Sequence, residues 1–149
     1  MSTGEPVVEI LNHQRRHRVD RSRIRAAAGA AFRGGHGSGN VITILLAGDR
    51  KLRQLNRNYR SKDQPTDVLS FPSGEATPEG RVHVGDIAIS MDDAARQADE
   101  EGCELERVVD RLVAHGVLHL LGFDHEVDDG EMNALQVRVL AGLSAKEGS

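Results

Sequence analysis

Short apolar segments of strand length alternate with longer segments of helical periodicity along this chain of 149 residues. Such alternation restricts the fold to the α/β and α+β classes, in which helices cover the faces of a sheet. The clearest strand candidate is 41–47, VITILLA, which is apolar almost throughout and typical of a buried strand. The other strand candidates are 7–11, 68–71 and 84–90. We therefore predict a small mixed β-sheet covered by about five helices.

Residues that start and stop helices mark out the helical segments. Asp20 and Asp49 each stand where a side chain could cap a helix start, and Ser90 with Asp93 resembles a capping box. Gly102 is a natural helix stop. We expect helices over about 20–32, from 49 to before Pro65, 91–101, 104–121 and 130–143, the second with an apolar stripe of Leu52, Leu55 and Tyr59.

Length and composition indicate a single domain spanning 1–149, without repeats or a long linker. No stretch approaches the roughly 20 apolar residues that cross a bilayer, and the N-terminus lacks a secretory pattern. The single cysteine, Cys103, cannot form an internal disulfide, which fits a reducing compartment. We expect a cytoplasmic protein without membrane contact.

The charge is distributed unevenly along the chain. Its net value of −4 argues against a protein that coats nucleic acid by bulk attraction. Arginines and lysines nevertheless gather in 15–25 and 50–62, whereas acidic residues gather after 75. A local basic surface in the first half of the chain is therefore compatible with the composition.

The segment 115–125, HGVLHLLGFDH, carries the candidate chemistry. His115 and His119 are four residues apart in the longest expected helix, so their imidazoles lie one turn apart on the same face. Gly122 stands where this helix should end, and a glycine cap with positive φ would let His125 return toward the pair. Three imidazoles leave one corner of a tetrahedral zinc open, as in catalytic sites. We therefore expect one zinc ion per chain.

Two alternatives to this zinc site are a spacing of histidines that arises by chance and the active site of a zinc protease. With seven histidines, about 0.3 pairs at this spacing are expected at random, and about 0.02 once the third histidine is required. The spacing is close to the H-E-x-x-H-x-x-G-x-x-H pattern of zinc proteases, but Gly116 replaces the glutamate that is their general base. Gly116 thus disfavours peptide hydrolysis and indicates close packing or substrate approach at the helix.

Three motifs resemble those of the YbeY family of bacterial zinc endoribonucleases. The segment 115–125 is similar to the family's H-G-x-L-H-L-x-G-x-D-H. The segment 55–72, LNRNYRSKDQPTDVLSFP, resembles L-N-x-x-Y-R-x-K-D-x-P-T-D-V-L-S-F-P, and 85–90, GDIAIS, resembles G-D-I-x-I-S. The motifs keep the family's order and cover about 41–143, whereas residues 1–40 match only loosely.

The resemblance implies a mixed-sheet fold with a zincin-like metal helix, and a hydrolase that cuts single-stranded RNA. Its implied role is maturation of the 3′ end of 16S rRNA in ribosome biogenesis, with rRNA, the small ribosomal subunit and the assembly GTPase Era as partners. Arg60 matches the family's functionally important arginine. We expect its planar guanidinium to pair with phosphate beside Arg57 and Lys62. Asp124 would orient a ligand imidazole or accept a proton from water.

Two other functions stay open at this point. A metallopeptidase or small amidohydrolase would keep the zinc and change the substrate. A non-catalytic ribosome assembly factor would use zinc as a structural ion and dock on RNA through its arginines. A fourth protein ligand on the metal would favour the structural role, because structural zinc sites are usually closed.

Overall fold

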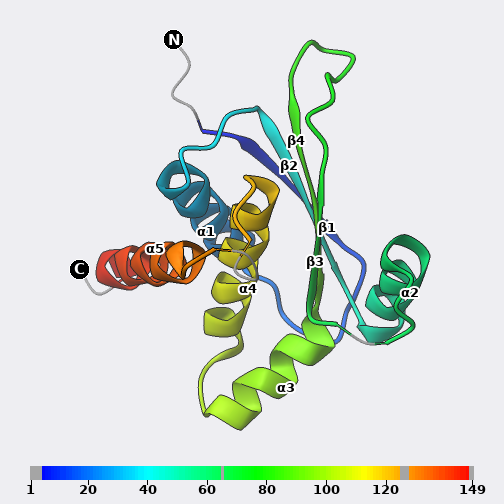
Figure 1. Cartoon of the computed structure of the whole chain (residues 1–149). Helices are drawn as coiled ribbons and strands as arrows, with labels where there is room; N and C mark the ends of the chain where they lie inside the picture. Colours follow the sequence, from blue (N-terminus) through cyan, green and yellow to red (C-terminus); the bar gives the residue numbers. More distant parts are fainter. Residues whose placement is uncertain (1–4, 65, 125–127, 148–149) are drawn as a thin grey trace.

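The computed structural model describes residues 5–64, 66–124 and 128–147, and within these ranges the chain forms four strands and five helices (Figure 1). Every expected strand and helix is present, and Pro65 lies outside the described residues. No helix in these ranges combines the length and the apolar character needed to cross a bilayer. The elements are β1 Val7–Asn12, α1 Arg21–Gly34, β2 Val41–Ala47, α2 Asp49–Arg60, β3 Val68–Pro72, β4 His83–Ser90, α3 Met91–Glu101, α4 Leu105–Leu120 and α5 Glu131–Glu147.

The strands form one sheet in the order β1-β2-β4-β3. β1, β2 and β4 are parallel, whereas β3 pairs antiparallel with β4 at the edge of the sheet. The parallel pairs require crossover connections, and α1 and α2 lie in these connections. The predicted class, an α/β fold with a small mixed sheet and five helices, is confirmed.

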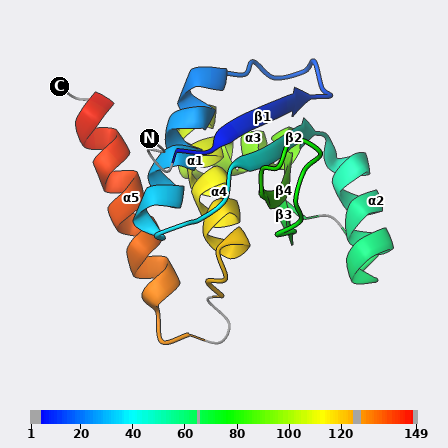
Figure 2. The ribbon, with the colours of Figure 1, turned by 90° about the horizontal axis from the view of Figure 1, so that it is seen from above.

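The two faces of the sheet are covered unequally (Figures 1 and 2). On one side α1 and α4 lie against the sheet, and α5 packs outside them. The main core fills this interface because the inward residues of the strands are apolar in alternation. Its largest fully buried side chains include Phe32, Ile42, Ile44, Ile87 and Leu118.

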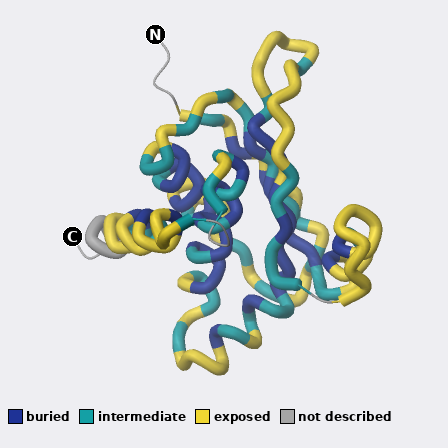
Figure 3. Tube along the Cα trace, viewed as in Figure 1, coloured by how far each residue is buried: buried dark blue, intermediate teal, exposed yellow. Residues whose placement is uncertain are grey.

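Of the helices in the described ranges, α2 alone lies on the opposite face of the sheet (Figure 1). It covers one end of that face through a small core of Ala47, Leu52, Leu69 and Ala88. Farther along the same face the sheet stays accessible, and Leu11 of β1 is 45% exposed. The surface of α2 that points away from the sheet is exposed (Figure 3).

Two of the predicted side-chain caps are present. The carboxylate of Asp20 accepts a hydrogen bond from the backbone N–H of Arg23 at 3.1 Å, at the start of α1. The hydroxyl of Ser90 accepts from the backbone N–H of Asp93 at 3.1 Å, at the start of α3. Both satisfy N–H groups that the helix itself leaves without a partner.

The prediction that Asp49 caps α2 is wrong. Gly48 is the N-cap of that helix and has no side chain to cap it, whereas the carboxylate of Asp92 accepts from the backbone N–H of Asp49 at 3.1 Å. The Asp49 carboxylate instead accepts from the hydroxyl of Ser90 at 2.8 Å and from the guanidinium of Arg96 at 2.8 and 3.0 Å. Because Arg96 belongs to α3, these bonds connect two helices, a tertiary role that outweighs the local cap.

Candidate active site

α4 presents the first two histidines of the predicted site on one stripe of its surface. Between Asp110 and Leu120 the helix is buried except at Arg111, His115 and His119, which recur every four residues. The ring centroids of His115 and His119 lie 5.0 Å apart, with the rings inclined at 66°. Since α1, α5 and the sheet pack around the other faces of α4, this stripe is held on a fixed element.

The turn that ends α4 has the predicted form. Gly122 has φ of 99°, and its N–H donates to the carbonyl of His119 at 3.0 Å. The N–H of Phe123 donates to the carbonyl of Leu118 at 3.1 Å, which completes a Schellman motif. This geometry reverses the chain after the helix, as a returning third histidine requires.

His125 lies outside the described residues, so its convergence on the pair stays a prediction. Among residues 5–64, 66–124 and 128–147, no three His, Cys, Asp or Glu side chains gather in a way that could hold a metal ion. A three-ligand site built on His115 and His119 therefore needs a side chain from outside these ranges, and His125 is the predicted one.

Gln136 of α5 holds the ring of His115, a contact that the sequence analysis missed. The Nδ1 atom of His115 lies 3.0 Å from Oε1 of Gln136. An amide oxygen only accepts, so this contact calls for a proton on Nδ1, and in the neutral imidazole the lone pair is then on Nε2. The signal was available in the sequence, because Gln136 interrupts the apolar stripe of buried residues Met132, Leu135 and Val139.

The described part of the site fits zinc. Imidazole nitrogen is a common zinc ligand, and a ligating histidine usually donates its other N–H to an acceptor that fixes its tautomer. His115 has that arrangement, with Gln136 as the acceptor. The two rings share one side of a rigid helix, which is the geometry that a shared ion requires.

Gly116 brings α4 into close contact with the sheet. A Cβ atom built on Gly116 would lie 2.8 Å from Cγ2 of Ile87 and 3.1 Å from its Cδ1. The carbonyl oxygen of Gly116 also accepts from the hydroxyl of Ser70 on β3 at 3.1 Å. Of the two explanations expected for this glycine, close packing is the one with direct contacts. The position that carries the general base in zinc proteases is therefore a buried backbone contact.

A chain of hydrogen bonds links the segment before β3 to the histidine stripe. The amide of Gln97 donates to the carboxylate of Asp67 at 2.9 Å and accepts from Arg111 at 3.1 Å. Arg111 also donates to Glu101 at 2.8 and 2.6 Å, and this pairing holds the pKa of the Glu101 carboxyl below its usual value. The carboxylate of Asp67 thus binds α3 directly and is linked to α4 through Gln97, so a structural role accounts for it.

Asp124 lies at the histidine end of α4 and is half-buried. Its carbonyl oxygen accepts from the N–H of Asp128 at 3.1 Å. The carboxylate of Asp128 in turn accepts from the N–H groups of Gly130 and Met132 at 2.8 and 3.0 Å, at the start of α5. The predicted part of Asp124 in catalysis stays a prediction.

The basic residues of the predicted substrate site lie on the other side of the sheet. Arg57 and Arg60 belong to the last turn of α2, and Lys62 follows its αL cap at Ser61; all three are exposed. Because α2 and α4 cover opposite faces, the edge strand β3 lies between these cations and the histidine stripe (Figure 1). A ligand that touches both groups must pass around that edge.

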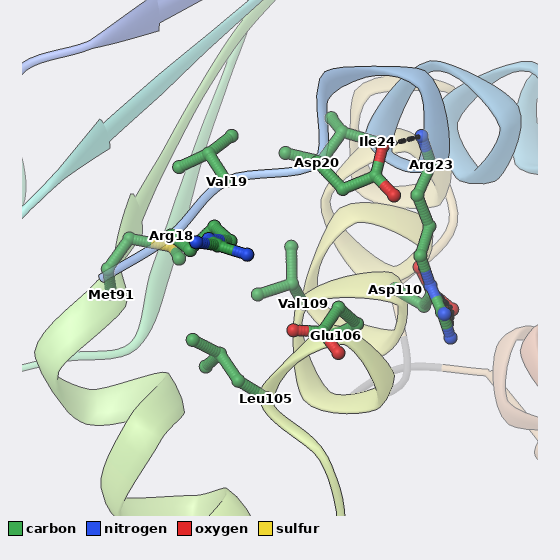
Figure 4. Close-up of a pocket in the computed structure, with 10 residues that line it drawn as sticks. All are labelled: Arg18, Val19, Asp20, Arg23, Ile24, Met91, Leu105, Glu106, Val109 and Asp110. Carbon is green, nitrogen blue, oxygen red and sulfur yellow. Dashed lines mark hydrogen bonds and ion pairs between the residues drawn. The ribbon is translucent and has the colours of Figure 1, made fainter.

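Hollows formed by the described residues beside α4 differ in what they could hold. One, of about 370 Å³, opens beside the last turn of the helix and is lined in part by Leu120, Leu121, His36 and Pro72. The other lies between α1, α3 and α4 (Figure 4) and encloses only about 10 Å³, which is room for about one water molecule. In that second hollow Arg23 and Asp110 pair with each other at 2.9 Å. Of these two hollows the larger alone has room for more than a water molecule, although its lining among the described residues does not include His115 or His119.

Comparison with known proteins associates the chain with one family. The family model described as Endoribonuclease YbeY matches residues 9–144, which includes most of the N-terminal part that the motifs leave unassigned. A relative from Aquifex aeolicus named Endoribonuclease YbeY is 46% identical over 112 residues, 72% of this chain and 74% of the relative. A relative of the same name from Thermus thermophilus is 41% identical over 138 residues, 91% of this chain and 99% of the relative.

A solved structure supports the fold. The solution structure of a Thermotoga maritima protein superposes with a TM-score of 0.61 and 24% sequence identity. The match covers 94% of this chain and 91% of that one. The arrangement of sheet and helices described above is therefore shared nearly from end to end.

Proposed function

The chain belongs to the YbeY family of endoribonucleases, and from this premise we propose that it is a zinc-dependent enzyme that cuts single-stranded RNA. We further propose that its substrate is 16S rRNA, whose 3′ end it matures in the cytoplasm. The observation that carries the metal dependence is the histidine pair on one stripe of α4, with the His115 ring held by Gln136.

Each residue of the site has a proposed part. His115, His119 and His125 would hold the ion, which when bound supplies Lewis acidity and lowers the pKa of a water to about 7. Gln136 keeps the proton of His115 on Nδ1, so that Nε2 presents its lone pair. Asp124, at the end of the same helix, would orient an imidazole or take a proton from the attacking water.

The proposed phosphate contacts come from α2. Arg60 presents a planar set of N–H donors that suits two phosphate oxygens at once, and Arg57 and Lys62 add positive charge nearby. Since α2 and α4 lie on opposite sides of β3 (Figure 1), the RNA strand would run over the edge of the sheet. A single strand bends around such an edge far more easily than a duplex, which is consistent with single-strand specificity.

Gly116 supports a nuclease over a peptidase. A side chain at this position would meet Ile87, so the glutamate of zinc proteases has no counterpart here. Hydrolysis of a phosphodiester instead needs an activated water and cations that offset charge on the phosphate, and the proposed residues supply both.

The first experiment compares RNA cleavage with and without a chelator. End-labelled single-stranded RNA and a duplex of the same sequence are incubated with the purified protein, and we expect cutting of the single strand alone, abolished by the chelator. Arg60→Ala should abolish cleavage while zinc content is retained. Arg53→Ala is the matched control, because Arg53 lies on the same helix but pairs with Asp63 at 2.8 Å. Equal loss in both variants would contradict a specific role for Arg60.

The proposed partners are rRNA, the small ribosomal subunit and the assembly GTPase Era. Co-sedimentation with purified small subunits, with and without Era, checks the assembly role separately from cleavage. Absence of any binding to the subunits would refute that role and leave the nuclease intact.

A further inference from the structure

We infer that the accessible face of the sheet beside α2 is a groove that binds the bases of single-stranded RNA, at a distance from the histidine stripe. This inference rests on the proposed function, because a base-binding groove is expected on a protein that acts on RNA. It adds a substrate subsite on the side of the sheet opposite α4.

The groove has an apolar floor and a polar rim. It measures about 460 Å³ and lies between Leu55 and Tyr59 of α2 and the side chains of the sheet. Its floor consists of side chains from the strands that point away from the main core, namely Leu11, Leu45, Phe71 and Ala88. Thr43 and Asp86, which pair across β2 and β4, add a hydroxyl and a carboxylate. Apolar surface with a few hydrogen-bonding groups is what a nucleobase requires.

Tyr59 stands at the edge of this groove and is the clearest sign of a ligand. The expected apolar stripe of α2 places it in the core, yet it is 70% exposed. Its ring meets that of Phe71 edge to face, with centroids 5.5 Å apart and an interplanar angle of 67°. Edge contact fixes the ring without covering both of its faces, so a base could stack there. Base stacking on aromatic side chains is the main sequence-tolerant contact in single-strand binding.

The positive charge of α2 indicates that the ligand of this groove is a polyanion and not a protein. The helix carries five cations and one acidic residue, Asp49, which is already bound by Arg96. Within the described residues Arg50, Arg57 and Arg60 have no ion pair, whereas Arg53 is paired with Asp63. Leu55 and Tyr59 of α2 line the groove, whereas Arg50 and Arg57 line a separate hollow on the same helix. A helix that carries unpaired arginines and borders an aromatic groove matches the combination of cationic track and stacking platform that binds single strands.

Asp86, the acidic residue of the groove, determines how a bound RNA strand would be oriented. Asp86 faces the groove and pairs with His83 at 3.2 Å, so phosphate is disfavoured over the middle of the sheet. The phosphates would therefore follow α2, with the bases directed onto the sheet. An RNA strand placed in this way would reach Arg60 at the end of α2 and then the edge of the sheet that separates α2 from α4.

The chain offers a direct spectroscopic test, because Tyr59 is its only tyrosine and it contains no tryptophan. Tyrosine emission is followed while single-stranded oligouridylate is added in the presence of a chelator, so that nothing is cut, with N-acetyltyrosinamide correcting for absorption by the RNA. We expect saturable quenching by the single strand, and none by an abasic strand or a duplex of the same length.

Affinity measured by anisotropy of labelled oligouridylate separates stacking from simple apolar contact. Tyr59→Leu should weaken binding about 5-fold or more, whereas Tyr59→Phe should bind like the wild type. Val137→Ala, a change at an exposed apolar residue of α5, is the control and should have no effect. Unchanged affinity in Tyr59→Leu, or unquenched emission at saturation, would overturn the inference.

Light scattering tests whether the groove is instead an interface between two copies of the protein. A dimer of the free protein that Tyr59→Leu dissociates would overturn the RNA groove in favour of a protein interface. Because all these measurements are made without metal, they are independent of the proposed cleavage. RNA binding at Tyr59 without any nuclease activity would refute the proposed function and leave the groove intact.

Discussion

Gly116→Ala is expected to destabilise the protein, although alanine favours helices. The new Cβ would lie 2.8 Å from Cγ2 of Ile87 and 3.1 Å from Cδ1. Ile87 is 1% exposed, belongs to β4 in the centre of the sheet and is β-branched, so it has little freedom to move. Overpacking of this kind costs about 1–3 kcal/mol, against about 1 kcal/mol gained in helix propensity. The net expectation is a loss of about 1 kcal/mol.

Gly142→Ala is the matched control, since Gly142 also lies inside a helix, α5. A Cβ built there meets nothing within 4 Å, so only the helix propensity changes. We expect a gain of up to about 1 kcal/mol. Urea unfolding followed by circular dichroism measures both variants, and the slope should stay that of the wild type.

A double substitution at Gly116 and Ile87 tests the same contact. In an Ile87→Ala background the clash is absent, so Gly116→Ala should no longer destabilise and should recover part of the lost packing. Stabilisation by Gly116→Ala in the wild-type background would refute the packing explanation for this glycine. Equal destabilisation in both backgrounds would refute it as well.

Two further predictions concern the histidine ring and the contact between α2 and α3. Gln136→Leu should weaken zinc binding about 10- to 100-fold in competition with a chromophoric chelator, while Gln136→Glu, which keeps an acceptor, should not; equal affinities would contradict the role of Gln136. The hydrogen bond from Arg96 holds the pKa of Asp49 below its ordinary 3.8, so this contact stabilises the fold above pH 3.8 and is lost as the pH falls through the lower folded value. Arg96→Met should therefore lower the urea midpoint at pH 6. In this variant the midpoint should also fall less between pH 4 and 2 than it does in the wild type. The effect is small because the side chain of Asp49 is 37% exposed.

Local signals in the sequence predicted the elements and several of their ends. The Asp20 and Ser90 caps depend on a side chain and an N–H three residues away, and both are present. The Gly122 turn depends on one residue with positive φ, and it is also present. Each of these is decided within one helical turn, which is why the sequence sufficed.

Features decided by tertiary packing could not be predicted in the same way. Asp49 has the residue type of a cap but bonds to Arg96, which is distant in sequence. The contact of His115 with Gln136 requires the packing of α5 on α4. Tyr59 fits the apolar stripe of its helix, yet it lies at the edge of the sheet groove, where it contacts Phe71 and stays 70% exposed. The sequence also does not determine that α2 and α4 lie on opposite faces, which separates Arg60 from the histidines.

Zinc content and RNA cleavage, measured on the same untagged preparation, test the central claim most directly. Elemental analysis should find about one zinc ion per chain in the wild type and a large loss in His119→Ala. The wild type should cut single-stranded RNA, stop when the zinc is removed by a chelator and resume when zinc is restored. Full zinc occupancy in His119→Ala, or cleavage that continues in protein stripped of metal, would contradict it.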